Sequence, residues 1–102
     1  MAHEAVVTHR LDVVSGIWKF SDATSVSTLY QLAQKWKTEE PKKYLGLHVR
    51  KCSKNQYGIS FLYVAEGFAQ KKFFHKITDQ LKRQFGNDFV GYDISEHVWM
   101  VE

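Results

Sequence analysis

The sequence predicts an α+β domain of the ferredoxin-like type, with four antiparallel strands and two helices packed on one face of the sheet. Three observations lead to this fold class. Segments typical of strands and helices follow one another in the order β-α-β-β-α-β. A short polar turn joins the two middle strands as in a hairpin, and each helix links two strands in a right-handed crossover. The 102 residues form a single domain, 1–102, because that length holds one core.

The first expected strand covers residues 5–20, where β-branched and aromatic side chains dominate. Ser15 and Gly16 interrupt this segment, and the glycine fits either a bulge in one bent strand or the turn of a hairpin. We favour the bent strand because the alternation of apolar and polar residues is weak on both sides. The pattern leaves open which face of this strand, and of the last one, is buried.

The first expected helix covers residues 25–39. Polar side chains at 21–25 can accept hydrogen bonds from the free amides of a first helical turn. Apolar residues then recur at helical spacing: Val26, Leu29, Leu32, Ala33 and Trp36. Pro41 ends the helix, because its ring cannot continue the hydrogen-bond ladder.

Two strands that form a hairpin come next, at residues 44–52 and 57–64, with a polar turn between them. In the first of them Leu45, Leu47 and Val49 share one side. His48 and Arg50 share the other side, which predicts a half-buried strand.

A second helix is expected within residues 69–86. Its apolar stripe consists of Phe74, Ile77, Leu81 and Phe85, with Phe73 at the margin. Gly86 follows as the residue that ends the helix. The last strand covers residues 89–101, and we expect an interruption near Ser95 and Glu96.

Composition excludes several classes of protein. The single cysteine, Cys52, excludes an internal disulfide framework and a multi-cysteine zinc site. No apolar stretch approaches the roughly 18 residues of a membrane span, and the first residues do not resemble a signal peptide. We therefore expect a cytoplasmic protein without a membrane partner.

Strand aromatics are the main candidate binding residues, because an open sheet face exposes side chains and Tyr and Trp are common in protein contacts. The candidates are Trp18, Tyr57, Phe61, Tyr63 and Trp99. Three basic residues near the hairpin turn, Arg50, Lys51 and Lys54, are candidates for contacts with phosphates.

Residues 55–63 compare only in part with the base-stacking motif of RNA-recognition domains. Rings recur at alternate positions, but Asn55 and Gln56 replace the basic residue and the first glycine, and Ile59 replaces a ring. The helix lysines would also lie opposite the open sheet face. A protein partner is therefore favoured over a nucleic acid.

No catalytic constellation stands out. His9, His48 and His97 lack the spacing of a metal motif, and Cys52 has no assignable histidine partner. We expect no catalytic residue, metal or cofactor. The preferred interpretation is a non-catalytic interaction or regulatory subunit that forms a homodimer or docks on a larger partner through its sheet face. The alternatives are a single-stranded RNA- or DNA-binding domain and, less favoured, a small dimeric enzyme of this fold.

Overall fold

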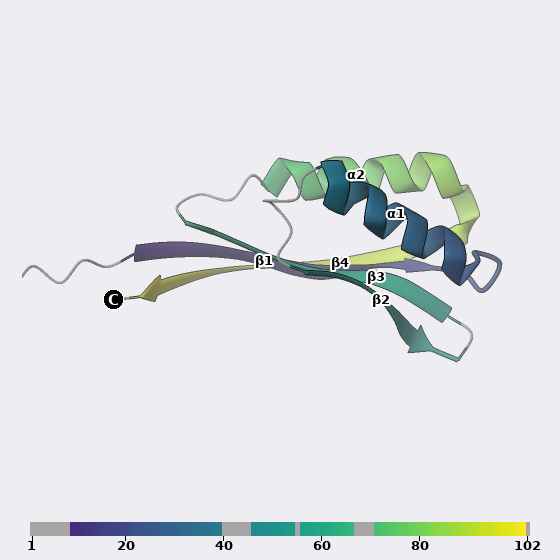
Figure 1. The fold of residues 1–102 in the computed structure, drawn as a ribbon, viewed down its shortest axis with the longest axis horizontal. Helices are drawn as coiled ribbons and strands as arrows, with labels where there is room; N and C mark the ends of the chain where they lie inside the picture. Colours follow the sequence, from purple (N-terminus) through teal and green to yellow (C-terminus); the bar gives the residue numbers. More distant parts are fainter. Residues whose placement is uncertain (1–8, 40–45, 55, 67–70, 102) are drawn as a thin grey trace, which may run out of the picture.

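The computed structural model describes residues 9–39, 46–54, 56–66 and 71–101. Its four strands are β1 (His9–Phe20), β2 (Gly46–Ser53), β3 (Gln56–Glu66) and β4 (Phe89–Val101). They form one antiparallel sheet in the order β2-β3-β1-β4. Helices α1 (Val26–Glu39) and α2 (Lys71–Phe85) lie on the same side of this sheet (Figure 1). The expected α+β architecture with two helices and four antiparallel strands is confirmed.

Strand β1 is a single strand, which confirms the interpretation favoured over a hairpin, but the bulge expected at Ser15 and Gly16 is absent. Its pairing with β3 and β4 runs regularly through both residues, and the one irregularity lies between Lys19 and Phe20. Gly16 is required because the β4 backbone and the Phe61 ring lie very close to it, and not because the chain turns there. A Cβ there would collide with the backbone oxygen of Asp93 and lie 2.8 Å from the Phe61 ring. The expected start of this strand, at residues 5–8, lies outside the described residues.

Helix α1 begins as expected after Ser25, whose Oγ accepts a hydrogen bond from the Thr28 N–H at 3.2 Å. Leu29, Ala33 and Trp36 are buried, which confirms the predicted stripe. The predicted helix end at Pro41 lies outside the described residues, as do Tyr44 and Leu45 of the next expected strand.

The hairpin of β2 and β3 has the predicted alternation. Leu47 is buried and Val49 half-buried, whereas His48 and Arg50 are exposed. The only residue of the expected turn that is not described is Asn55.

Helix α2 buries Phe74, Ile77 and Leu81, in agreement with the predicted stripe. It ends at Phe85, and Gly86 follows with a φ of +54°, which glycine readily adopts. A short 3-10 helix (Gly86–Asp88) leads into β4.

Strand β4 is also continuous, and the interruption expected near Ser95 and Glu96 is wrong. Ser95 pairs with Ser15 of β1 and Glu96 with Val14, without any shift in register. Both side chains are exposed. Their polarity therefore has no burial cost and gives the strand no reason to break.

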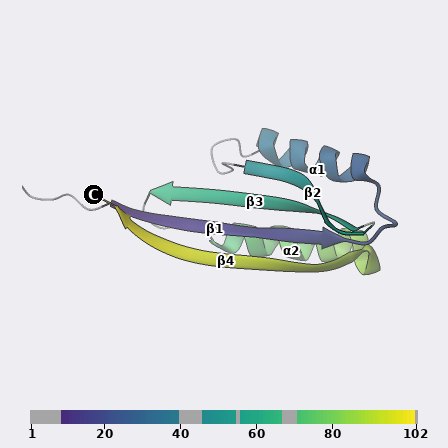
Figure 2. The same cartoon turned by 90° about the horizontal axis from the view of Figure 1, so that it is seen from below.

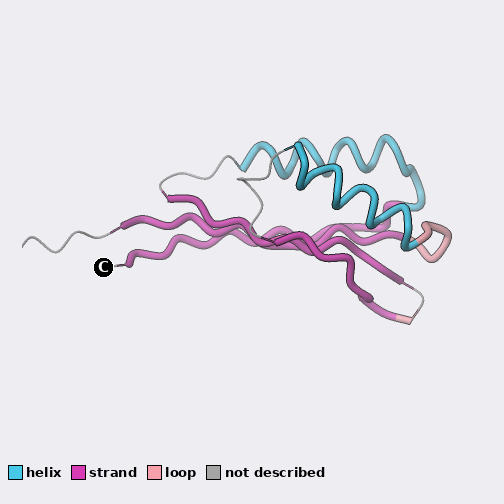
Figure 3. The backbone as a smooth tube through the Cα atoms, in the orientation of Figure 1, coloured by secondary structure: helices cyan, strands magenta, loops and turns pink. Residues whose placement is uncertain are grey.

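The core lies between the helices and the sheet, with Trp18 of β1 near its centre. Its ring stacks on Phe61 with centroids 4.2 Å apart and meets Trp36 edge-on at 5.1 Å. The helices cover only part of the sheet. One end, made by the start of β1 and the ends of β3 and β4, extends past them (Figures 1 and 3). None of the described helices combines the length and apolar character needed to cross a membrane.

Candidate interaction surface

Strand register identifies the side of the sheet that faces away from the helices. Trp18, fully buried beneath the helices, pairs with Ile59 of β3 and Tyr92 of β4. Directly paired residues share a side and successive residues alternate, so this register assigns the strand positions apart from the irregularities at Lys19/Phe20 and Lys51/Ser53. We call the side away from the helices the open face; Figure 2 views the sheet from this side.

An apolar patch covers the open face near the projecting end of the sheet. We define the apolar patch as Leu11, Val13, Leu62, Val64, Trp99 and Val101. Val13 is only 3% exposed although no helix covers it, because its paired neighbours Val64 and His97 flank it. Trp99 is 53% exposed and pairs with Leu11. Hydrophobic surface of this kind is what protein contacts bury.

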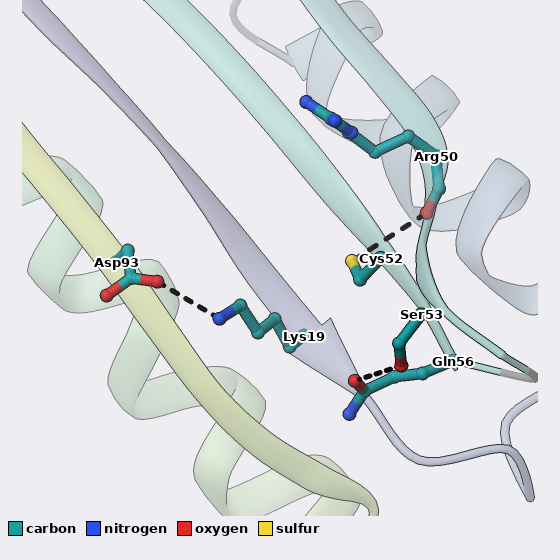
Figure 4. Close-up of polar contacts among 6 residues, drawn as sticks. All are labelled: Lys19, Arg50, Cys52, Ser53, Gln56 and Asp93. Atoms are coloured by element: carbon teal, nitrogen blue, oxygen red, sulfur yellow. Dashed lines mark hydrogen bonds and ion pairs between the residues drawn. The ribbon is translucent and has the colours of Figure 1, made fainter.

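Beyond the apolar patch the open face becomes polar. Ser15 pairs with Ser95 across β1 and β4, and Ile17 pairs with Asp93. The Asp93 carboxylate lies 3.1 Å from the Lys19 ammonium (Figure 4). Both side chains are well exposed, so this ion pair contributes little to stability. The apolar residues of the open face therefore gather at the projecting end, where His9, His97 and Glu66 pair with Val101, Val13 and Leu11, and the Lys19–Asp93 ion pair lies toward the other end.

Four of the five predicted ring residues lie on the helix side of the sheet. Trp18 and Phe61 are in the core, and Tyr57 and Tyr63 are partly buried against it. The structure thus corrects the expectation that these rings line an exposed sheet face. Their burial follows from the need to fill the space between the helices and a small sheet. Trp99 is the one predicted ring on the open face.

The predicted basic residues do not converge on one surface. Arg50 lies on the open face, whereas Lys51 pairs with Tyr57 and so lies on the helix side. Lys54 lies in the turn between β2 and β3. Cys52 is half-buried beside Gly58, and its thiol donates a long hydrogen bond of 3.9 Å to the Arg50 carbonyl (Figure 4). These positions give no single positive groove for a phosphate backbone.

Sequence reasoning did not assign a structural role to Asp12. This side chain is 2% exposed on the helix side of β1, and its Oδ1 lies 2.9 Å from Arg10 Nε. Opposite charges two residues apart in a strand share a side, so their spacing was a signal that could have identified the pair. The pair lies near the projecting end, beside the exposed Val98 and Met100, which pair with Asp12 and Arg10.

The three histidines noted in the sequence remain apart. His48 pairs with Ser60, His97 with Val13 and His9 with Val101, so each lies in a different row of the open face. Within the described ranges, no group of three or more His, Cys, Asp or Glu side chains is placed to hold a metal ion.

Comparison with known proteins gives no relative: no family model, no curated protein and no solved structure matches the chain.

Proposed function

We propose that this chain is a small, non-catalytic interaction subunit that binds a second protein chain, in the first instance another copy of itself, through the helix-free part of its sheet. The observation that carries the proposal is the apolar patch on the open face. Trp99 supplies a large, exposed ring at one edge of this patch, and large aromatic side chains contribute strongly to binding energy in protein interfaces.

The distribution of rings favours a protein partner over a nucleic acid. Base stacking needs several exposed ring faces along one surface. On the open face Trp99 is followed by aliphatic residues, and Tyr57, Phe61 and Tyr63 pack toward the core. Aliphatic side chains beside one ring match a protein surface better than a row of bases.

The fold supports the same function. We propose the ferredoxin-like plait as its finer description, because the two crossovers interleave: β1 and β3 lie side by side at the centre, and β2 and β4 form the edges. Both helices pack on one side, which leaves the other side for a partner. The half-buried free thiol of Cys52 suits a reducing compartment such as the cytoplasm.

Light scattering and sedimentation over a micromolar to millimolar range test the proposed function. Two exposed rings give a matched pair of variants: Trp99 on the open face, 53% exposed, and Tyr30 on α1, 59% exposed. We expect the mass of the wild type to rise above that of the monomer with concentration. Trp99→Ala weakens this association by about tenfold or more, and Tyr30→Ala leaves it unchanged. A monomer mass at every concentration would contradict the proposal.

A further inference from the structure

Strand β4 is a long strand at one edge of the sheet. It has 13 residues and pairs with β1 on one side, and among the described residues no strand lies on its other side. An edge of this length offers free backbone groups to another strand unless charges or prolines block it. The segment contains no Lys, Arg or Pro, its two charged residues are Asp93 and Glu96, and its last four residues, Val98–Val101, are all apolar.

We infer that two copies of the chain pair through β4 in antiparallel fashion, about a two-fold axis at Ser95, to form one continuous eight-stranded sheet. This inference rests on the proposed self-association and names its partner and its register; of the apolar patch it uses the two residues on β4, Trp99 and Val101. With the axis at Ser95, residues 90–100 of one β4 lie opposite residues 100–90 of the second copy, and Phe89, beyond the irregularity in the pairing of β1 with β4, lies at the end of the paired region.

The side chains of β4 are complementary to themselves in this register. On the open face, Asp93 lies opposite His97 of the second copy, and Trp99 lies opposite Gly91. The space above Gly91 is open, with no atom within 4 Å of an added Cβ, so the indole can lie over it. The Asp93 carboxylate, which lies 3.1 Å from the Lys19 ammonium of its own chain, can also accept a hydrogen bond from a ring N–H of His97 across the strand pair. Each of these contacts occurs twice, once on either side of the axis.

Neighbouring registers are less favourable. An axis at Asp93 or Glu96 places two identical carboxylates opposite each other, which is destabilising. An axis at Ile94 leaves Met100 and Val101 without partners. An axis between two residues would pair a side chain of the open face with one of the helix side, which the pleat forbids. Ser95 therefore gives the best register.

On the helix side of β4, Ile94 lies opposite Glu96 of the second copy next to the axis, and the apolar residues farther from the axis fit the same arrangement. Helix α2 covers the first half of the strand, where Lys82 Nζ lies 5.2 Å from the centre of the Tyr92 ring. Val98 and Met100, 48% and 62% exposed, lie in the other half, on the helix side at the projecting end. In the antiparallel pair, Val98 lies opposite Tyr92 of the second copy and Met100 opposite Val90. Each copy thus covers the apolar end that the other leaves bare.

Cysteine cross-linking tests this register, in a Cys52→Ala background that removes the native thiol. Ser95→Cys places two thiols directly opposite each other, with Cα atoms about 5 Å apart, a distance that a disulfide spans. Ser15→Cys is the matched control: it lies in the same row of the open face, one strand inward. Across the proposed dimer the two Ser15 positions are three strand spacings apart, about 14 Å, which is too far to cross-link.

We expect Ser95→Cys to give a covalent dimer on mild oxidation and Ser15→Cys to stay monomeric on a denaturing gel. If the wild type sediments as a dimer while Ser95→Cys fails to cross-link, or Ser15→Cys cross-links instead, β4 pairing is overturned but the proposed self-association stands. A wild type that is monomeric at every concentration overturns both.

Exchange of the Asp93 and His97 side chains provides a second measurement. His97→Asp places a carboxylate directly opposite Asp93 on each side of the axis, and we expect the repulsion between these like charges to weaken the dimer several-fold. The double variant Asp93→His with His97→Asp restores the carboxylate–imidazole pair and the affinity, because the exposed Lys19–Asp93 ion pair that it removes contributes little to stability. A double variant as weak as the single one contradicts the register.

Discussion

The indole Nε1 of Trp18 donates a hydrogen bond to Thr78 Oγ1 at 2.9 Å, and this contact joins β1 to α2 inside the core. The Thr78 hydroxyl in turn donates to the Phe74 carbonyl one helical turn earlier, also at 2.9 Å. Both side chains are buried. The bond therefore helps to hold the Trp18 side of β1 against the helices, and the opposite side of the strand becomes the open face.

Replacing Thr78 with valine tests this bond. Thr78→Val keeps the shape of the side chain but leaves the buried indole N–H without its acceptor, which we expect to lower the free energy of unfolding by about 1–3 kcal/mol. Chemical denaturation measures the loss. Thr78→Ser retains the hydroxyl and serves as the control. Equal stability of the valine and serine variants would contradict the role of the bond.

Gly16 and Gly91 offer a matched pair of glycines in neighbouring strands. A Cβ at Gly16 collides with the Asp93 backbone, whereas one at Gly91 meets nothing within 4 Å. We expect Gly16→Ala to destabilise the fold by about 1–3 kcal/mol, because backbone must move to make room. Gly91→Ala should leave thermal stability unchanged or slightly higher. Similar melting temperatures for the two variants would show that β1 and β4 do not approach so closely at Gly16.

The buried carboxylate of Asp12 provides another prediction about stability. Asp12→Ala removes the acceptor that lies 2.9 Å from Arg10 Nε. Because Arg10 is partly exposed and can turn to solvent, we expect a moderate loss of about 1–2 kcal/mol in the free energy of unfolding. Asp79→Ala, at an exposed position on α2, is the control and should change stability by about 0.5 kcal/mol or less. An Asp12→Ala variant as stable as the wild type would contradict a structural role for this carboxylate.

Local sequence patterns predicted the helices and strands of this fold well, because the apolar spacing and the capping residues that mark them are clear in the sequence. The helical stripe at Phe74, Ile77 and Leu81 and the cap at Ser25 depend on neighbours within a few residues. The bulge expected at Gly16 and the interruption expected near Ser95 were wrong for a common reason. In each case the decisive partner lies in another strand, and a single sequence does not show which strands pair.

The same limitation explains why the sequence did not separate the buried rings of the candidate site from the exposed one. The choice between core and surface for Trp18, Phe61 and Trp99 depends on which side of each strand the helices cover. Alternation alone gives two equivalent faces, and only the register with α1 and α2 in place separates them. Of the predicted rings, Trp99 alone is exposed on the open face. It lies on the edge strand β4, on the side of the sheet away from the helices.

Collisional quenching of tryptophan fluorescence tests the role of the helix-free sheet most directly. Trp18 and Trp36 are buried, at 0% and 7% exposure, so acrylamide reaches chiefly Trp99. If this part of the sheet binds a second chain, the quenchable fraction falls as protein concentration rises through the association seen by sedimentation, and Trp99→Ala abolishes the change. A quenchable fraction that stays constant while the protein associates would show that the partner binds elsewhere.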